Sequence, residues 1–161
     1  GVALDINADK AAETYQRLSH LGPDKNESNK VLVETFVPKG VETLVGITSS
    51  SLGKVLTIGV GGILTEVISD VSVRLLPVDS KIVNEMIDET RLAILFSGVR
   101  GAAASNRDAF VDTVLRITDA VIDWPSGCEL DINPLTVLPD GAWVLDSAYS
   151  PAAKSSERST H

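Results

Sequence analysis

Residues 129–146 are the stretch that most restricts the possible folds of this chain. They read Glu-Leu-Asp-Ile-Asn-Pro-Leu-Thr-Val-Leu, then Pro-Asp-Gly, then Ala-Trp-Val-Leu-Asp, and two apolar-rich runs around a Pro-Asp-Gly turn predict a β-hairpin. Alternation places Glu129, Asp131 and Asn133 on one face of the first strand and Ile132 on the other. The returning strand brings Asp146 alongside Asn133. Two oxygen ligands therefore come within reach of one hard cation, and we expect a site for Mg²⁺ with a nucleotide.

The composition is that of a globular domain that does not bind nucleic acid. Of the 161 residues, 43% are hydrophobic, which allows one domain with a sizeable core. The formal net charge of −8 argues against a nucleic-acid partner, because such proteins present a basic surface. Cys128 is the only cysteine, so no internal disulfide forms.

The sequence predicts a cytoplasmic protein with no membrane contact. No apolar run approaches the roughly 18 residues that a membrane span needs, and no basic-then-apolar leader precedes the first residues. The chain opens at Gly1, without a methionine, directly into a strand-like segment. We therefore expect a piece of a larger polypeptide.

The remaining patterns predict an α+β domain with a mostly antiparallel sheet and flanking helices. Consecutive β-rich runs separated by short turns predict a meander, whereas apolar residues spaced by three and four predict helices. We expect strands over 31–37, 41–48 and 54–60, and helices over 8–21, from 80 onward, over 89–96 and from 106 onward. The clearest helix carries on one face Phe110, Val114, Ile117 and Val121.

Two features in the middle of the chain fit either a structural or a ligand-binding role. Gly61 and Gly62 follow a predicted strand, and backbone amides in such a turn bind anions, but a tight turn without a ligand explains the glycines at least as well. Arg74 is the only cation in an apolar run. It pairs with an acid such as Glu66 or Asp70, or it meets a phosphate.

Seven motifs occur in a fixed order along residues 1–149. They are Val-Leu-Val-Glu at 31–34, Gly-Val-Glu at 40–42, Val-Gly at 45–46, Gly-Val-Gly-Gly-Ile at 59–63, Arg-Leu-Leu-Pro at 74–77, Gly-Val-Arg-Gly at 98–101, and Glu-Leu-Asp-Ile-Asn-Pro-Leu at 129–135 with Asp146. This ordered set resembles the ATP-grasp domain of the NDP-forming (ADP-forming) acyl-CoA synthetases, which are relatives of the succinyl-CoA synthetase beta subunit. The resemblance implies that residues 1–149 form an ATP-grasp domain that lacks its N-terminal part, and we expect residues 150–161 to be a disordered tail.

The resemblance implies a ligase that uses ATP or ADP with Mg²⁺. In this family acyl-CoA and phosphate give an acyl phosphate, a histidine on another domain carries the phosphoryl group, and the ATP-grasp domain exchanges that group with ADP. The implied partners are the CoA-binding domain and the phosphohistidine-bearing domain, which also supply acyl-CoA and phosphate. The resemblance is also compatible with assembly into an oligomer.

The resemblance also implies roles for individual residues. Asn133 and Asp146 correspond to the magnesium ligands, and Asp131 corresponds to the acid that steadies the visiting phosphohistidine. The strand Val31, Leu32, Val33 and Glu34 corresponds to the hinge whose backbone meets the adenine. Glu42 falls near the ribose, although alternation alone places Glu34 and Glu42 on the solvent face of a half-buried sheet. For the phosphates the candidates are Gly61, Gly62, Arg74 and Arg100.

One departure from the family pattern limits the implied activity. A lysine that contacts the nucleotide phosphates and a His-Lys stretch normally precede the first of these motifs, and this chain begins after both. The two histidines, His20 and His161, lie on the predicted first helix and in the tail. We therefore expect no turnover by this chain alone. The alternatives are a regulatory module without catalysis, like the one fused to some protein lysine acetyltransferases, and a structural interaction domain.

Overall fold

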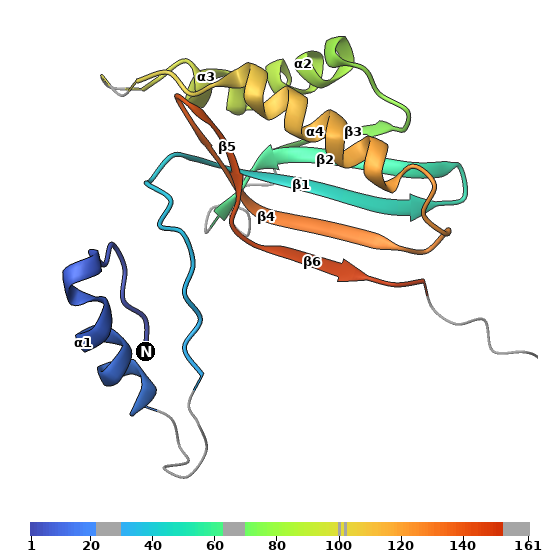
Figure 1. Cartoon of the computed structure of the whole chain (residues 1–161). Helices are drawn as coiled ribbons and strands as arrows, with labels where there is room; N and C mark the ends of the chain where they lie inside the picture. The colour runs from blue at the N-terminus through green and yellow to red at the C-terminus, as the bar shows by residue number, and fades with distance from the viewer. Residues whose placement is uncertain (22–29, 63–69, 100, 102, 153–161) are drawn as a thin grey trace, which may run out of the picture. The chain divides into compact units, whose positions relative to one another are not determined.

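The computed structural model describes residues 1–21, 30–62, 70–99, 101 and 103–152 (Figure 1). Its backbone divides into two units, Gly1–Pro38 and Lys39–His161. No helix in the described part of the chain is long and apolar enough to cross a membrane.

The larger unit is built on a six-stranded antiparallel sheet. Its strands are β1 (Val41–Ser50), β2 (Gly53–Val60), β3 (Val71–Leu75), β4 (Glu129–Leu138), β5 (Gly141–Val144) and β6 (Ser147–Ser150). The order across the sheet is β3-β2-β1-β4-β5, and β6 also pairs with β4. The hairpin of β1 and β2 and the hairpin of β4 and β5 confirm two of the strand pairs predicted from the sequence.

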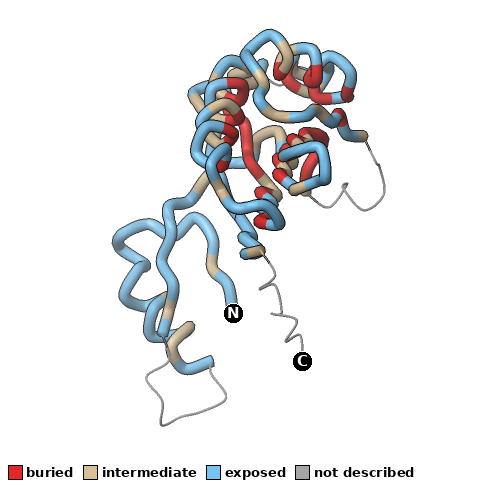
Figure 2. The backbone as a smooth tube through the Cα atoms, turned by 90° about the vertical axis from the view of Figure 1, so that its right-hand side faces the viewer, coloured by how far each residue is buried: buried red, intermediate tan, exposed pale blue. Residues whose placement is uncertain are grey.

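Three helices pack on one face of this sheet, namely α2 (Ser80–Asp88), α3 (Leu92–Phe96) and α4 (Arg107–Val121) (Figure 1). Side chains cap the starts of two of these helices: an Asp79 carboxylate oxygen accepts from the Ile82 amide, and the Asn106 side chain accepts from the Ala109 amide. The core between helices and sheet includes Val45, Ile47, Leu56, Ile58, Val83, Met86, Ile87, Leu92, Phe96, Phe110, Val114, Val121, Ile132, Leu135 and Val137. Figure 2 shows this buried set in red within the larger unit.

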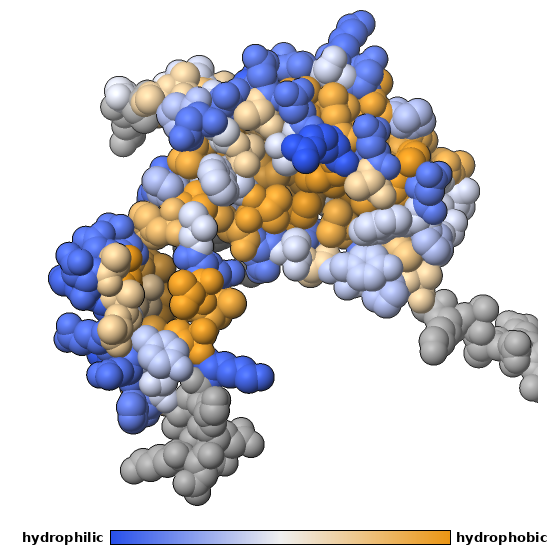
Figure 3. All heavy atoms as spheres, in the orientation of Figure 1, coloured by the Kyte–Doolittle hydropathy of each residue, from blue (hydrophilic) through white to orange (hydrophobic). Residues whose placement is uncertain are grey.

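Alternation along the strands separates this helix-covered face from the other one, which we call the open face. In antiparallel pairs, residues directly opposite each other point to the same side. One row across the open face contains Val73, Thr57, Gly46, Asp131 and Ala148, because these residues lie opposite one another in turn. In the view of Figure 3, hydrophilic side chains cover much of the outer surface of the helices, while apolar atoms gather where the helices meet the sheet.

Strand β4 contains a register shift at Asn133–Pro134. Ile132 pairs with Val45, but Leu135 pairs with Thr43, so two residues of β4 oppose Leu44 alone. A β-bulge of this kind accommodates a proline, which cannot donate to the ladder. Without the extra residue, strict alternation from Asp131 would place Leu135 on the open face, yet Leu135 is fully buried.

The smaller unit contains helix α1 (Ala8–Ser19) and an extended segment without regular structure. The predicted strand over 31–37, and its hairpin with the following strand, are wrong, because residues 30–40 form no strand. A strand needs a neighbour for its backbone groups. Both edges of β1 are occupied, by β2 and β4. The described residues of the smaller unit contain no strand with which residues 31–37 could pair instead.

Candidate functional site

Asp131 lies in the middle of the open face. It is exposed on β4, opposite Gly46 on one side and Ala148 on the other. Both neighbours are small, so no bulky side chain stands directly beside the carboxylate in this row. Within the described residues, the Asp131 side chain has neither a hydrogen bond nor an ion pair.

Asn133 and Asp146 are adjacent through the backbone. The Asn133 amide donates to the Asp146 carbonyl at 3.2 Å, and the Leu145 amide donates to the Pro134 carbonyl at 3.0 Å. These two bonds continue the ladder between the β5 and β6 pairings with β4. The predicted apposition of Asn133 and Asp146 is therefore present at the bulge.

The turn after β2 contacts Asn133 directly. The Gly62 amide donates to Asn133 Oδ1 at 2.9 Å, and the Gly61 amide donates to the Glu42 carbonyl at 3.0 Å. A side chain at Gly62 would be strained, because the residue has φ +70, and a Cβ there would also displace the Glu42 carboxylate. Glu42, Gly62 and Asn133 thus form one cluster, which we call the glycine-turn cluster.

A buried hydroxyl lies beside this cluster. Thr136 is opposite Glu42 in the β1–β4 pairing and only 2% exposed. In the described part of the chain its Oγ1 has no hydrogen-bond partner. Such a group is uncommon in a native protein and is one that a bound molecule can satisfy.

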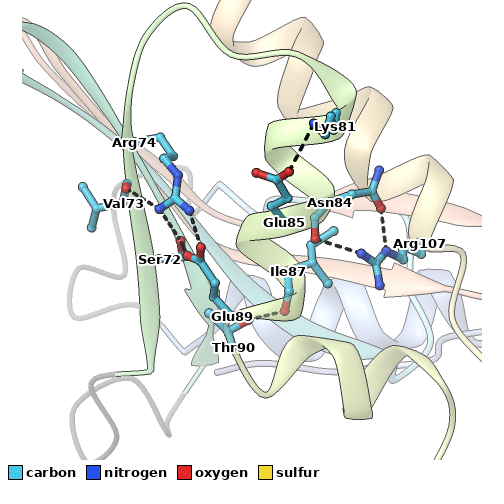
Figure 4. Close-up of polar contacts among 10 residues, drawn as sticks. All are labelled: Ser72, Val73, Arg74, Lys81, Asn84, Glu85, Ile87, Glu89, Thr90 and Arg107. Carbon is cyan, nitrogen blue, oxygen red and sulfur yellow. Dashed lines mark hydrogen bonds and ion pairs between the residues drawn. The ribbon is translucent and has the colours of Figure 1, made fainter.

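Arg74 lies on the opposite side of the sheet from Asp131. It pairs with Leu56, a core residue, so it points to the helix-covered face. Its guanidinium donates to Glu89 at the end of α2, and Ser72 also donates to Glu89 (Figure 4). The acid that pairs with Arg74 is therefore Glu89. Of the two expected acids, Asp70 accepts instead from the Arg91 amide at 2.8 Å, and Glu66 lies outside the described residues.

The pKa of Glu89 is lowered from its ordinary value, first by the hydrogen bond from Arg74 and then by the one from Ser72. A second ion pair has the same character: Arg107 at the start of α4 binds Asp88 at 2.7 Å and lowers the pKa of that carboxyl by hydrogen bonding. Both arginines therefore serve the contacts of α2 with its neighbours.

The other predicted site residues belong to the smaller unit or lie outside the described part of the chain. Val31, Leu32, Val33 and Glu34 belong to the smaller unit, where Leu32 and Val33 are exposed. Arg100 lies outside the described residues. Their assignments stay predictions.

The oxygen donors at the bulge fit a hard cation such as Mg²⁺. Asn133 supplies an amide oxygen and Asp146 supplies a carboxylate, which are the ligand types that Mg²⁺ prefers. No group of three or more His, Cys, Asp or Glu side chains that could hold a metal is found in the described ranges. A cation at Asn133 and Asp146 would thus complete its shell with water and phosphate oxygens, as Mg²⁺ commonly does.

A family model described as "ATP-grasp domain" matches residues 1–149. The chain belongs to this ATP-grasp family. The match covers every described strand and helix except the last residue of β6. The family predicted from the ordered motifs is confirmed.

Curated relatives are ADP-forming acyl-CoA ligases. The chain is 30% identical over 153 residues to the acetate--CoA ligase [ADP-forming] I subunit beta of Pyrococcus furiosus, covering 91% of this chain and 66% of that subunit. It is 34% identical over 117 residues to the acetate--CoA ligase [ADP-forming] I of Archaeoglobus fulgidus, covering 17% of that enzyme. The chain is therefore homologous to the ATP-grasp portion of these ligases and spans only part of their length.

Solved structures show the same fold. An acetyl-coenzyme A synthetase 1 from Ca. Korarchaeum cryptofilum, in complex with coenzyme A and Mg-AMPPCP and with its phosphohistidine segment pointing towards the nucleotide binding site, matches with a TM-score of 0.66 and 29% identity. That match covers 71% of this chain and 54% of the other. Another structure of that synthetase, with coenzyme A and acetyl-coenzyme A, covers 92% of this chain with a TM-score of 0.74.

Sequence reasoning missed two features of the site. Pro134 inside a predicted strand was a signal for the bulge, since proline is confined to strand edges and bulges. The bond from Gly62 to Asn133 joins residues 71 positions apart. No local sequence pattern predicts this hydrogen bond.

Proposed function

We propose that the chain is the nucleotide- and Mg²⁺-binding portion of an ADP-forming acyl-CoA synthetase. The observation that carries this proposal is the apposition of Asn133 and Asp146 at the β4 bulge, with Asp131 two residues away on the same strand and the same face. The homologues are ADP-forming ligases. One related structure holds Mg-AMPPCP, which supports a metal-nucleotide complex as the ligand here.

In the proposed reaction a phosphoryl group moves between a histidine of another domain and the terminal phosphate oxygen of ADP. The N–P bond of the phosphohistidine breaks, an O–P bond to ADP forms, and the histidine nitrogen retains the electron pair; the reverse direction uses ATP. Mg²⁺ supplies charge neutralisation at the phosphate oxygens. Asn133 and Asp146 hold the cation, and Asp131 accepts the free N–H of the visiting imidazole and so orients the ring.

The remaining assignments belong to the same proposal. Val31, Leu32, Val33 and Glu34 meet the adenine, and Glu42 lies near the ribose, where the unpartnered Thr136 hydroxyl next to it supports a polar ligand. Gly61, Gly62 and Arg100 stay candidates for the phosphate region, whereas we do not propose a phosphate contact for Arg74, which faces the helices and pairs with Glu89. We infer further that the CoA-binding and phosphohistidine-bearing domains of the synthetase are the partners, and that the complex works in the cytoplasm.

Titration with Mg-ADP and Mg-ATP tests this function. Asn133→Ala and Asp146→Ala should each weaken nucleotide binding by about tenfold or more, because each removes about half of the protein's metal ligands. A tenfold change corresponds to a loss of about 1.4 kcal/mol in binding free energy. Asp140→Ala is the matched control, because Asp140 is an exposed acid in the turn between β4 and β5. If neither substitution weakens binding relative to Asp140→Ala, the metal assignment is wrong.

The same donors argue against a purely regulatory module. A sensor that transfers no phosphoryl group has less need of paired magnesium ligands and of an acid for a visiting histidine. Phosphoryl transfer to ADP by the synthetase that contains this chain, lost on Asp131→Asn with Mg-ADP binding retained, would separate the enzyme from the sensor.

A further inference from the structure

Gly46 is a glycine in the interior of the central strand of the sheet. It lies on β1 between Val45 and Ile47, which are both core residues, and its own position is on the open face. Its cross-strand neighbours are Thr57 and Asp131. Strand interiors favour β-branched and aromatic residues, and glycine weakens them.

The fold itself does not require a glycine at this position. A Cβ on Gly46 would meet within 4 Å only the Thr57 Cβ, at 3.8 Å, which is an ordinary contact, and its φ lies outside the left-handed region. Two glycines nearby differ from it. A Cβ on Gly59 would lie 2.4 Å from the Asp70 carbonyl oxygen, and one on Gly61 would lie 2.4 Å from Thr43 backbone atoms.

The remaining reasons for a strand glycine are a bulge or the close approach of a ligand. The β1–β4 register shift lies between Thr43 and Val45 on β1, and the pairing of Gly46 with Asp131 is regular. Within the described residues no backbone approaches Gly46 closely enough to exclude a Cβ. Among these reasons, the approach of a bound group is therefore the one that the described residues leave for Gly46.

The chemistry beside Gly46 selects the kind of group. Asp131 accepts hydrogen bonds and repels anions, so a bare phosphate is disfavoured directly next to it. An imidazole ring offers an N–H donor and is flat, and it fits beside a carboxylate where the neighbouring side chains are small. Ala148 and Thr57, on the two sides of this pair in the same row, are small as well.

We propose that Gly46 is a positioning residue that keeps open the space in which the imidazole of the phosphohistidine lies against Asp131. This inference rests on the proposed function. The absence of a side chain at 46 lets the ring approach the sheet closely enough for its N–H to reach the carboxylate. A side chain there would hold the ring away from Asp131 and displace the phosphoryl group from the nucleotide.

The test compares Gly46→Ala and Gly46→Val in the complete synthetase that contains this chain. The measured quantities are the single-turnover rate of phosphoryl transfer from the phosphohistidine to ADP and the dissociation constant of Mg-ADP. We expect the transfer rate to fall about tenfold or more for Gly46→Val and by less for Gly46→Ala, because small misplacements of reacting groups are costly. The affinity for Mg-ADP should stay unchanged.

Ser150→Val is the matched control. Ser150 is exposed on β6 and lies opposite Glu129, one row from Asp131, so it adds similar bulk beside a different acid. This control should transfer at the unsubstituted rate. Gly46→Ala provides a variant that is expected to fold, because the structure has room for its methyl group, so a failure of Gly46→Val to fold does not prevent the test.

Three results would overturn the proposal: an unchanged transfer rate in a folded Gly46→Val enzyme, an equal loss in Ser150→Val, or a loss fully explained by weaker Mg-ADP binding. If the unsubstituted enzyme itself neither binds Mg-ADP nor transfers the phosphoryl group, the proposed function fails together with this inference. If the unsubstituted enzyme binds Mg-ADP and transfers the phosphoryl group, normal transfer in both Gly46 variants would exclude the role of Gly46 and leave the proposed function standing.

Discussion

The Lys54 side chain on β2 contacts the end of helix α4. Its Nζ donates to the carbonyls of Ile122 and Trp124, at 3.1 and 2.7 Å, just after the end of α4. The last carbonyls of a helix have no partner within the helix, and a cation near them also opposes the helix dipole. Lys54 on β2 therefore ties the end of α4 to the sheet.

Replacing Lys54 by methionine should lower the free energy of unfolding by about 1–3 kcal/mol, because it removes a charged donor from two carbonyls. Urea denaturation measures this change. Lys81→Met is the control: Lys81 is mostly exposed and 3.8 Å from Glu85, so its loss should cost less than about 1 kcal/mol. Equal effects of the two substitutions would contradict the role given to Lys54.

Two glycines should respond to alanine in opposite directions. Gly46→Ala should raise the free energy of unfolding by about 0.5–1 kcal/mol, since its methyl group meets only an ordinary contact and glycine is unfavourable in a strand. Gly61→Ala should lower it, because the Cβ would collide with Thr43 backbone atoms. Thermal and chemical denaturation of both variants check the signs, and a destabilised Gly46→Ala would show that the fold itself needs this glycine.

At the scale of elements, β3 and α2 are joined by a pH-dependent contact. Glu89 accepts from Arg74 and Ser72 (Figure 4), and its pKa is lowered in the folded protein. A lowered carboxylate pKa means that the contact stabilises the fold above the pKa of the unfolded chain. That stabilisation is lost as the pH falls from there through the folded pKa.

Glu89→Gln should therefore be less stable than the unsubstituted chain at neutral pH, and the difference should shrink as the pH is lowered below the ordinary range of a glutamate. Denaturation curves at a series of pH values measure the difference. Glu85→Gln is the control, because Glu85 lies on α2 in an exposed ion pair with Lys81, and it should destabilise the chain less than Glu89→Gln does at neutral pH. A difference that stays constant with pH would contradict this account.

Local signals predicted most elements of the larger unit, and non-local pairing decided the rest. The caps at Asp79 and Asn106 and the Pro-Asp-Gly turn act over three or four residues, so they are readable from sequence. The segment 31–37 has strand-like composition but forms no strand, because β1 is already paired on both edges. The same limit applies to the site: the hairpin predicted that Asn133 and Asp146 meet, but no pattern predicted that Gly62 binds Asn133.

At the scale of the whole molecule, the residues assigned to the nucleotide are divided between the two units. The residues assigned to the adenine, Val31–Glu34, belong to Gly1–Pro38, whereas Asn133 and Asp146 belong to Lys39–His161. Binding of the adenine by Val31–Glu34 would restrict this segment of the smaller unit. Lys39, which is exposed directly after that unit, offers a tryptic site that reports on this restriction.

Mg-ADP at saturating concentration should therefore slow tryptic cleavage after Lys39, because cleavage requires the segment to open and a ligand that binds only the native state reduces that opening in proportion to its saturation. Asp146→Asn should weaken the protection, since Mg-ADP then binds less tightly, while Asp140→Asn should retain it. Mg-ADP that binds but leaves cleavage after Lys39 unchanged would place the adenine away from Val31–Glu34 and confine the nucleotide to the larger unit.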